Sequence, residues 1–511
     1  MKNRIKQYLL AASMCVGLTA CSDFFEPIPG VQFGLDETFA SKQRTEEYLN
    51  NVYSYVREVT DAIHPNTYGG IFTEASLDGA NRWNKTYAEW TNGSFNSASA
   101  QASEYFSKYY QAIAKASTFI QNVDKCTEAA ASTRGKWKSE ARALRAYYYF
   151  ELLRLYGPIP LIGEDPIPLD ASLEELIKER NSVDECVNFI ATELQSAIDS
   201  GDLLQRAGKA NLGRMDVATC MALKAKLYLY WASPLFNGNT DQASVKNKDG
   251  KQLFPQTEDN SKWAQARDAY ERFMTFATGQ GYKLTEVYTN GKLDPYASCR
   301  AAGEFFTTTW EAVDELIFVK LRDLYDYTYW VCPKFTDFQD TDVTGGGGYY
   351  TTQETVDLFF TKDGLTIEED PGYDKFEGIP SANNFTSGRY YDPNNPSRLY
   401  FDADKSKVLK QWKDREPRFY VNITYSGSIW LNEGKYNEEM RTDFTNGANG
   451  TCGKSKASGD CPDSGYLIRR GAKASNNNGS KHFSPVLRLA DMYLGYAEAL
   501  CMCSDLDNAL T

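Results

Sequence analysis

The chain has 511 residues, 14% of them aromatic, and carries a formal net charge of −13. A chain of this length exceeds the roughly 100–200 residues of an ordinary compact domain, so it contains either two domains or a repeat array. An acidic surface repels phosphate backbones, which argues against nucleic acid as a partner.

The N-terminus has the three parts of a bacterial lipoprotein signal. Three basic residues precede residues 8–17, an apolar segment that is too short to span a bilayer as a mature helix. Residues 18–21, Leu-Thr-Ala-Cys, then look like a lipobox, at which cleavage leaves an acylated cysteine as the first residue. The alternative is an ordinary secretory cleavage that happens to precede a cysteine. We therefore expect a signal peptide over residues 1–20 and an anchor-and-linker segment over residues 21–43, acylated at Cys21.

Apolar residues recur at helical spacing over most of the chain from residue 44 to residue 278. The expected helices are residues 44–63, 103–125, 136–156, 182–200, 214–233 and 261–278. Within two of these pairs the helix starts lie about 33 and 32 residues apart, close to the tetratricopeptide period. In such repeats each helix hairpin buries its face only against the next. The predicted fold class is therefore mainly α, with tetratricopeptide-like helical repeats over residues 44–278.

The helix expected at residues 136–156 is the strongest of these signals. Its apolar residues occupy two neighbouring faces, so other elements must cover it on two sides. Gly157 and Pro158 end it, because glycine accepts the left-handed cap conformation and proline cannot extend the hydrogen-bond ladder. The rings that we assign to the core of the helical part are Tyr147, Tyr148, Tyr149, Tyr228 and Trp231.

Residues 279–485 have a different character from the helical part. They are rich in Gly, Asn, Asp, Pro and Tyr and hold only short apolar runs, such as residues 315–319. We expect this region to be a large, loop-rich, irregular insertion folded onto the helices. Helical periodicity returns at residues 486–503, within a C-terminal segment of residues 486–511.

Several sequence blocks resemble those of one known family. Arg142 and the runs at residues 145–150 and 153–161 are similar to the helix-and-exit signature of the SusD/RagB family, lipid-anchored nutrient-binding proteins on the surface of Bacteroidetes cells. Further similar blocks follow in the family's order at residues 213–238, 360–364, 415–420, 464–469 and 488–500. Family members usually continue past the last block into another helix, whereas this chain stops at Thr511. We therefore expect a truncated C-terminal segment with one uncovered helix face.

Two clusters of rings outside the predicted helices are candidate ligand-binding residues. The flat face of a ring buries apolar C–H surface while polar neighbours satisfy hydroxyl groups, and each stack contributes about 0.5–1.5 kcal/mol. The alternative for every ring is packing against the helical repeats. The first cluster holds Trp83, Tyr87 and Trp90 with Asn81, Arg82 and Asn84, and the second holds Tyr325, Tyr327, Tyr329 and Trp330 with Arg322 and Asp326.

The sequence offers little for catalysis or metal binding. The motifs GxSxG, HExxH, GxGxxG and the Walker spacing are absent, so we expect no enzymatic activity and no cofactor. A glycosidase with two carboxylates would leave no such motif and stays an alternative. Weak calcium candidates are Asp337, Asp340 and Asp342, which miss the EF-hand spacing, so a solvated acidic loop is the preferred interpretation. Cys452 and Cys461 flank a polar loop and allow a disulfide in an oxidising exterior.

The family resemblance implies a cell-surface lipoprotein of the outer membrane that binds a glycan. It further implies delivery of that glycan to a SusC-like TonB-dependent transporter, with no small-molecule cofactor. The alternative is a RagB-like surface lipoprotein that binds peptides or other proteins and has no glycan ligand. We expect residues 44–278 to make most of the transporter contact and the rings around Trp83 and Trp330 to face the ligand.

Overall fold

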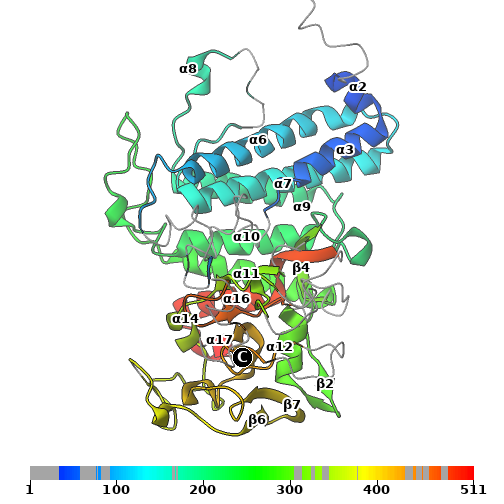
Figure 1. Cartoon of the computed structure of the whole chain (residues 1–511). Coiled ribbons are helices and arrows are strands. Elements are labelled where there is room, and N and C mark those ends of the chain that lie inside the picture. Colours follow the sequence, from blue (N-terminus) through cyan, green and yellow to red (C-terminus); the bar gives the residue numbers. More distant parts are fainter. Residues whose placement is uncertain are drawn as a thin grey trace, which may run out of the picture.

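The protein, seen in a computed structural model, consists of a stack of helices and a less regular lobe (Figure 1). We call the first region the helical stack, and the described residues from 280 to 488 the lobe. The structure describes residues 34–57, 76, 79–81, 93–163, 167, 171–303, 314–323, 329–335, 345–376, 378–431, 441–444, 452, 460–472 and 481–510.

The helical stack follows chain order, so each long helix packs against the next one along the sequence. This confirms the predicted tetratricopeptide-like, mainly α architecture. Short helices precede, interrupt and follow the stack: α2 Leu35–Ala40, α8 Leu173–Leu176 and α17 Leu506–Leu510. The long helices are α3 Lys42–Tyr53, α6 Ala100–Asn122, α7 Ala131–Tyr156, α9 Val183–Asp199, α10 Val217–Ala232, α11 Ser261–Gly279 and α16 Leu489–Met502.

One predicted helix boundary is wrong. The helix expected to reach residue 63 ends at Tyr53, and Ser54 caps it with its backbone N–H. Lys320 of the lobe then donates from its ammonium to the carbonyl oxygens of Ser54 and Val56, at 2.9 and 2.5 Å. A cation at the C-terminal carbonyl groups satisfies acceptors that the helix leaves open. Residues 54–57 are therefore not helical, whereas residues 58–63 of the predicted helix lie outside the described residues.

Helix α7 is covered on two sides, as its sequence predicts. Its rings Tyr147, Tyr148 and Tyr149 are all buried. Gly157 ends the helix at φ +68°, in the left-handed region, and its N–H donates to the Leu153 carbonyl oxygen at 3.0 Å. Two further rings assigned to the core, Tyr228 and Trp231, pack against the same core from half-buried positions.

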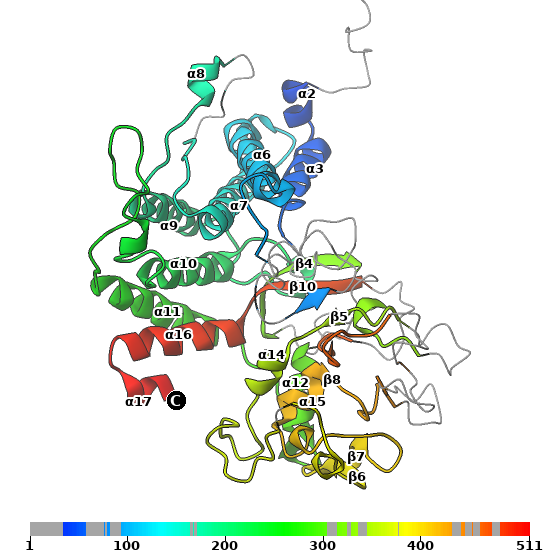
Figure 2. The same cartoon turned by 60° about the vertical axis from the view of Figure 1, so that its left-hand side comes forward.

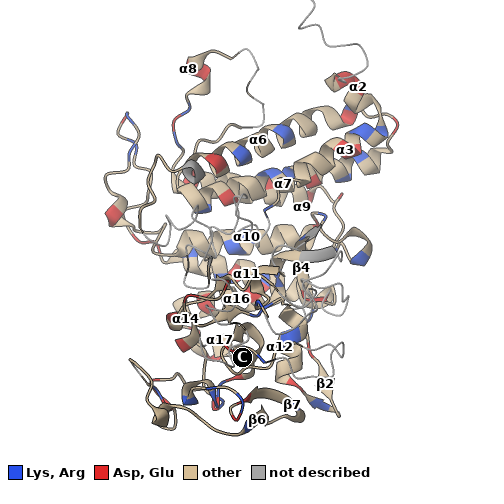
Figure 3. Ribbon diagram, viewed as in Figure 1, with Lys and Arg blue, Asp and Glu red and all other residues tan. Residues whose placement is uncertain are grey.

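Three charged side chains of α7 are buried as well. Arg145 is 0% exposed and donates to Glu193 of α9 at 2.7 Å and to Ser117 of α6 at 3.0 Å. Glu140 accepts from the Tyr53 hydroxyl of α3 at 2.9 Å, and Glu151 pairs with Arg154 at 2.8 Å. The charges of α7 thus connect it to the helices on either side. Basic and acidic residues are mixed along the helices (Figure 3).

The last long helix, α16, has one packed side and one exposed side. Helix α16 packs on α11 through residues such as Met492 and Ala499, both 0% exposed. On its other side Tyr493, Leu494 and Met502 are exposed. Among the described residues, no helix is both long enough and apolar enough to cross a membrane.

The lobe contains more strands than its loop-rich sequence suggests. Its helices are α12 Pro295–Gly303, α14 Gln353–Asp357 and α15 Pro417–Asn422. Its strands are β2 Tyr288–Thr289, β3 Lys292–Leu293, β4 Leu316–Asp323, β5 Tyr349–Tyr350, β6 Arg389–Asp392, β7 Asn395–Asp402, β8 Ile423–Thr424, β9 Leu467–Ile468 and β10 Lys481–Arg488.

The antiparallel ribbon of β4 and β10 attaches the lobe to the stack (Figure 2). Ile317, Phe318 and Leu487 of this ribbon belong to the main core, together with α7 and α10. The Thr219 hydroxyl of α10 also donates to the Ile317 carbonyl oxygen at 3.4 Å. Two residues of the apolar run at 315–319, Ile317 and Phe318, are therefore buried against the stack, whereas Leu316 and Val319 belong to a separate small cluster.

Candidate ligand-binding site

The structure describes only part of the two ring clusters. Asn81 lies in strand β1, Ala80–Asn81, and Tyr329 and Trp330 form a short helical turn in the lobe. Arg322 lies in strand β4. The other members of the two clusters lie outside the described residues: Arg82, Trp83, Asn84, Tyr87, Trp90, Tyr325, Asp326 and Tyr327. Their role as ligand-binding residues stays a prediction.

A small sheet brings the ends of the two clusters together. Strand β1 pairs antiparallel with β5, where Asn81 lies opposite Tyr349 and Ala80 lies opposite Tyr350. Strand β5 in turn pairs with β9 through Tyr350 and Leu467, and the sheet order is β1-β5-β9-β8. Residues far apart in the sequence therefore share one sheet, which the periodicity of either segment does not reveal.

A run of glycines connects this sheet to the second cluster. The N–H of Gly346 donates to the Tyr329 carbonyl oxygen at 2.7 Å, and that of Gly348 donates to the Trp330 carbonyl oxygen at 3.1 Å. A Cβ atom at Gly346 would lie 2.3 Å from the Trp330 ring. Only glycine permits so close an approach of the backbone to the ring. The glycines at residues 345–348 thus place Trp330 directly beside the strand that pairs with Asn81.

Tyr329 and Trp330 are each half-buried, and their ring centroids lie 5.0 Å apart with the planes at 82°. Trp330 packs on a small core of the lobe that includes Val331, Phe335 and Trp430. The sequence left two interpretations open for this ring, core packing and ligand stacking, and the arrangement is compatible with both. One side of the ring is held by the core, and the rest is accessible to a partner such as a sugar ring.

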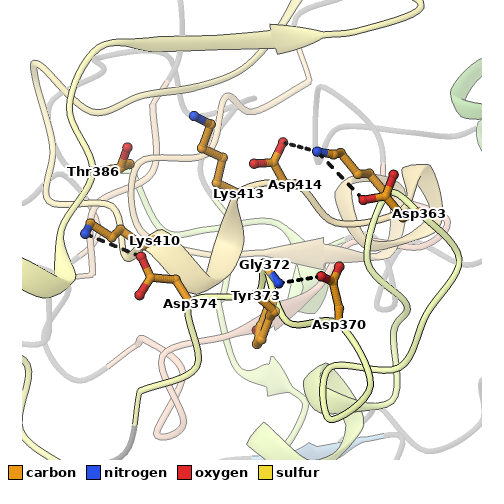
Figure 4. Close-up of a pocket in the computed structure, with 10 residues that line it drawn as sticks. Asp363, Asp370, Gly372, Tyr373, Asp374, Thr386, Lys410, Lys413 and Asp414 are labelled. Atoms are coloured by element: carbon orange, nitrogen blue, oxygen red, sulfur yellow. Dashed lines mark hydrogen bonds and ion pairs between the residues drawn. The ribbon is translucent and has the colours of Figure 1, made fainter.

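A polar pocket that the sequence analysis did not single out lies elsewhere in the lobe (Figure 4). Its cavity volume is about 280 Å³. Two lysines in it are paired: Lys410 lies 3.3 Å from Asp374, and Lys362 lies 3.9 Å from both Asp363 and Asp414. In the sequence, only the closely spaced Lys and Asp residues of segments 362–374 and 410–414 could have indicated this pocket. The lining residues are Lys362, Asp363, Asp370, Gly372, Tyr373, Asp374, Thr386, Lys410, Lys413 and Asp414.

The remaining candidates from the sequence have different outcomes. The lipidation candidate Cys21 and the calcium candidates Asp337, Asp340 and Asp342 lie outside the described residues. Cys452 and Cys461 are both buried and are not joined to each other by a disulfide.

Two family models match this chain. The model described as "SusD family" matches residues 315–511, which include most of the lobe and helix α16. The model described as "Starch-binding associating with outer membrane" matches residues 32–229, which form most of the helical stack. The two matches follow one another along the chain and together include both regions of the structure.

Individual proteins of known sequence or structure are also similar. A SusD-like protein of Bacteroides ovatus ATCC 8483 is 27% identical over 175 residues, which is 33% of this chain and 30% of that protein. The match therefore spans less than a third of this relative. The solved structure of BT4246 superposes with a TM-score of 0.72 at 23% identity, covering 92% of this chain and 80% of that one. A SusD-like carbohydrate-binding protein from Bacteroides fragilis NCTC 9343 superposes with a TM-score of 0.60 at 18% identity, covering 91% of this chain and 75% of that one.

Proposed function

Because the chain belongs to the SusD/RagB family, we propose that it is a lipid-anchored protein of the outer-membrane surface that captures a polysaccharide and delivers it to a SusC-like transporter. It acts by binding and not by catalysis. The family model over the stack is described as starch-binding and outer-membrane-associated, and one similar structure is that of a carbohydrate-binding protein. These descriptions support a glycan as the ligand.

The observation that supports the proposal is that a small sheet and the glycines beside it bring parts of the two ring clusters close together. Asn81 of the first cluster pairs with Tyr349, and the glycines before Tyr349 bond to the backbone of Tyr329 and Trp330 of the second cluster. A half-exposed Trp330 with Tyr329 at 82° to it offers an apolar face for the C–H surface of a sugar. The polar side chains of the same clusters provide partners for its hydroxyl groups.

Calorimetric titration of the wild-type protein against starch, xylan, pectin and mucin glycans tests this proposal. We expect Trp330→Ala to weaken binding roughly fivefold, because one stack of about 1 kcal/mol is lost. Tyr288→Ala is the matched control, since Tyr288 is a 60% exposed ring elsewhere in the lobe. Binding of no polysaccharide by the wild-type protein would reject the proposal. Equal binding by Trp330→Ala would reject the assignment of this ring.

Anchoring through Cys21 is tested in cells. We expect Cys21→Ala to move the protein from the membrane fraction to the soluble fraction, because acyl chains contribute about 0.8 kcal/mol for each buried methylene. A variant that remains membrane-bound after a high-salt wash would contradict acylation at this residue.

The helical stack is the proposed contact surface for the transporter. Helix α8 stands away from the stack in Figure 1 and exposes Leu173, Leu176 and Ile177. Exposed aliphatic side chains that gather in one place are typical of protein contacts. A photocrosslinker at Leu176 should trap a protein of the size of an outer-membrane transporter, and one at Ile379, which is 96% exposed on the lobe, should not. The opposite result would move the contact to the lobe.

A further inference from the structure

We infer that the polar pocket of the lobe is a second saccharide-binding site, which takes one or two sugar residues of the same polymer that contacts Trp330. This inference rests on the proposed function, since it assigns a second contact to the same ligand. The pocket lies in a different part of the lobe: its walls come from residues 362–374, 386 and 410–414, none of which belongs to the candidate site around Trp330.

The charges of the pocket define the chemistry of its ligand. Lys362, Lys410 and Lys413 face four carboxylates, those of Asp363, Asp370, Asp374 and Asp414 (Figure 4). An anion would meet the four carboxylates, a cation would meet the three ammonium groups, and an apolar molecule would leave all seven charges desolvated. A hydroxyl group both donates and accepts, so a polyhydroxylated ring can bond to carboxylates and ammonium groups at once.

The size of the cavity agrees with a short saccharide. Its volume of about 280 Å³ lies just below the roughly 300–1,000 Å³ of sites for drug-sized molecules. The carboxylate oxygens of its aspartates can accept hydrogen bonds from the hydroxyl groups of a sugar.

The pocket stands on a rigid base. Arg415 is 2% exposed and donates to the carbonyl oxygens of Val356 and Phe359, both at 2.7 Å. It also donates to the Tyr373 hydroxyl at 2.8 Å, and that hydroxyl donates to the Gln411 carbonyl oxygen at 3.0 Å. The Tyr373 ring is therefore fixed in the wall before any ligand arrives. Preorganised groups of this kind lose little conformational entropy on binding.

Asp414 contributes a second fixed element. Its backbone adopts φ +55°, which few residues other than glycine accept. Two hydrogen bonds hold it there: its carbonyl oxygen accepts from the N–H of Lys362 at 2.8 Å, and its carboxylate accepts from the Tyr390 hydroxyl at 3.0 Å. This conformation joins the two segments that form the pocket and directs the carboxylate toward Lys362.

Lys413 is the donor that remains for a ligand. Lys362 and Lys410 each pair with an aspartate, whereas within the described part of the chain Lys413 forms no ion pair. Its ammonium group lies 5.5 Å from the centroid of the Tyr390 ring. Figure 4 shows the ammonium group at the edge of the pocket, without a bonded carboxylate.

Two sites on one lobe have a consequence for long ligands. Trp330 packs on the core of Val331 and Phe335, whereas the pocket stands on a separate core that includes Val356 and Trp412. A polymer that occupies both sites gains from effective concentration, while a ligand that fills one site does not. The second site therefore contributes most to polysaccharide binding and least to the binding of a monosaccharide.

The test uses the full chain and the panel polysaccharide that the wild-type protein binds most tightly. We expect the double variant Asp374→Asn/Lys413→Met to bind this polymer roughly tenfold more weakly, with an unchanged melting temperature. Lys405→Met is the matched control, because Lys405 is an exposed lysine of the same segment outside the pocket. Thr386→Val removes one hydroxyl group from the pocket wall at constant shape, and it serves as the second variant if the double variant does not fold.

The outcomes separate the two hypotheses. If the wild-type protein binds the polymer and both pocket variants bind it equally well, the second site is rejected while the proposed function stands. If the wild-type protein binds no saccharide of the panel, both fail. If Lys405→Met weakens binding as much as the pocket variants do, the effect is one of surface charge and the second site is again rejected.

Discussion

The helical stack and the lobe are held together in different ways. The stack has one continuous core, in which each helix contacts its neighbour in the sequence. The lobe has several small cores, and its sheet order β1-β5-β9-β8 joins residues that are far apart in the chain. Sequence-local contacts build the scaffold of this protein, and distant contacts build its candidate binding sites. Substitutions in the stack should therefore act mainly on stability, whereas substitutions in the lobe should affect ligand binding as well when they lie near a candidate site.

The largest expected effect is in the stack, at Arg145. Arg145 is 0% and Glu193 is 4% exposed, so Arg145→Ala removes the buried cation that pairs with this carboxylate and leaves only Arg142, at 3.2 Å. Removing one partner of a buried pair costs about 3–5 kcal/mol, and because Arg142 remains we expect the loss at the lower end of this range. Chemical denaturation should show this loss as a lower midpoint at an unchanged slope.

Lys138→Ala is the control on the same helix. Lys138 pairs with Asp124 at 2.6 Å, but both side chains are exposed, so its removal should cost less than about 1 kcal/mol. If both variants lose the same free energy of unfolding, the buried ion pair of Arg145 stabilises the stack no more than an exposed pair does.

The second prediction concerns the lobe. Gly346→Ala places a Cβ atom 2.3 Å from the Trp330 ring and 2.8 Å from the Tyr329 ring. Overpacking of this kind costs about 1–3 kcal/mol. Because the two rings must move, polysaccharide binding should weaken together with the melting temperature.

Gly279→Ala is the matched control for this substitution. No atom lies within 4 Å of a Cβ atom built at Gly279, at the end of α11. It should leave both the melting temperature and the affinity close to those of the wild type. Unchanged affinity in Gly346→Ala would mean that the position of the Trp330 ring does not matter for the ligand.

Sequence predicts the two regions unequally well, for a physical reason. In the stack the contacts of α7 repeat every three or four residues, so periodicity alone located each long helix to within a few residues. Glycine at residue 157 marked its end correctly. The exception is the end of α3, where residues 54–57 are not helical and Lys320, more than 260 positions away, binds the carbonyl oxygens of Ser54 and Val56.

In the lobe the informative contacts do not repeat. The pairing of Asn81 with Tyr349 depends on the path of the chain between them, which no local pattern encodes. The sequence analysis missed the pocket because its lysines and aspartates lie in two separate segments. Mixed charges of this kind are also typical of ordinary solvent-exposed loops. The left-handed backbone of Asp414 could not be predicted either, because aspartate adopts positive φ values far less readily than glycine does.

The third prediction uses pH to probe the lobe. Asp294 accepts from Arg398 at 2.9 Å, and this hydrogen bond to the guanidinium group lowers the pKa of Asp294 to about 2. Its contribution to stability is therefore present above its ordinary pKa near 3.8 and is lost as the pH falls through about 2. Asp294→Asn should lower the stability at pH 7 by about 1.5 kcal/mol, the size of one charge-assisted hydrogen bond, and should have little effect near pH 2. A loss that is equal at both pH values would contradict the ion pair.

The last prediction concerns an aspartate of the stack whose pKa moves in the opposite direction. Asp216 is 0% exposed, and burial raises its pKa to about 6, although its carboxylate accepts from the N–H groups of Thr219 and Ala207, both at 2.7 Å. The folded state thus binds a proton more tightly than the unfolded state does. This contribution is fully present below about 3.8 and is lost as the pH rises through about 6.

Asp216→Asn removes the titrating group and keeps an acceptor oxygen at the start of α10. The melting temperature of the variant relative to the wild type should therefore rise between pH 4 and pH 7, because only the wild-type protein acquires a buried charge over that range. The net difference at pH 7 should stay below about 1 kcal/mol, since the amide also loses one of the two N–H bonds. A difference that is constant from pH 4 to pH 7 would show that Asp216 does not titrate there. The opposite pH slopes of Asp216 and Asp294 would then no longer separate a buried carboxylate bonded to backbone N–H groups from one bonded to an arginine.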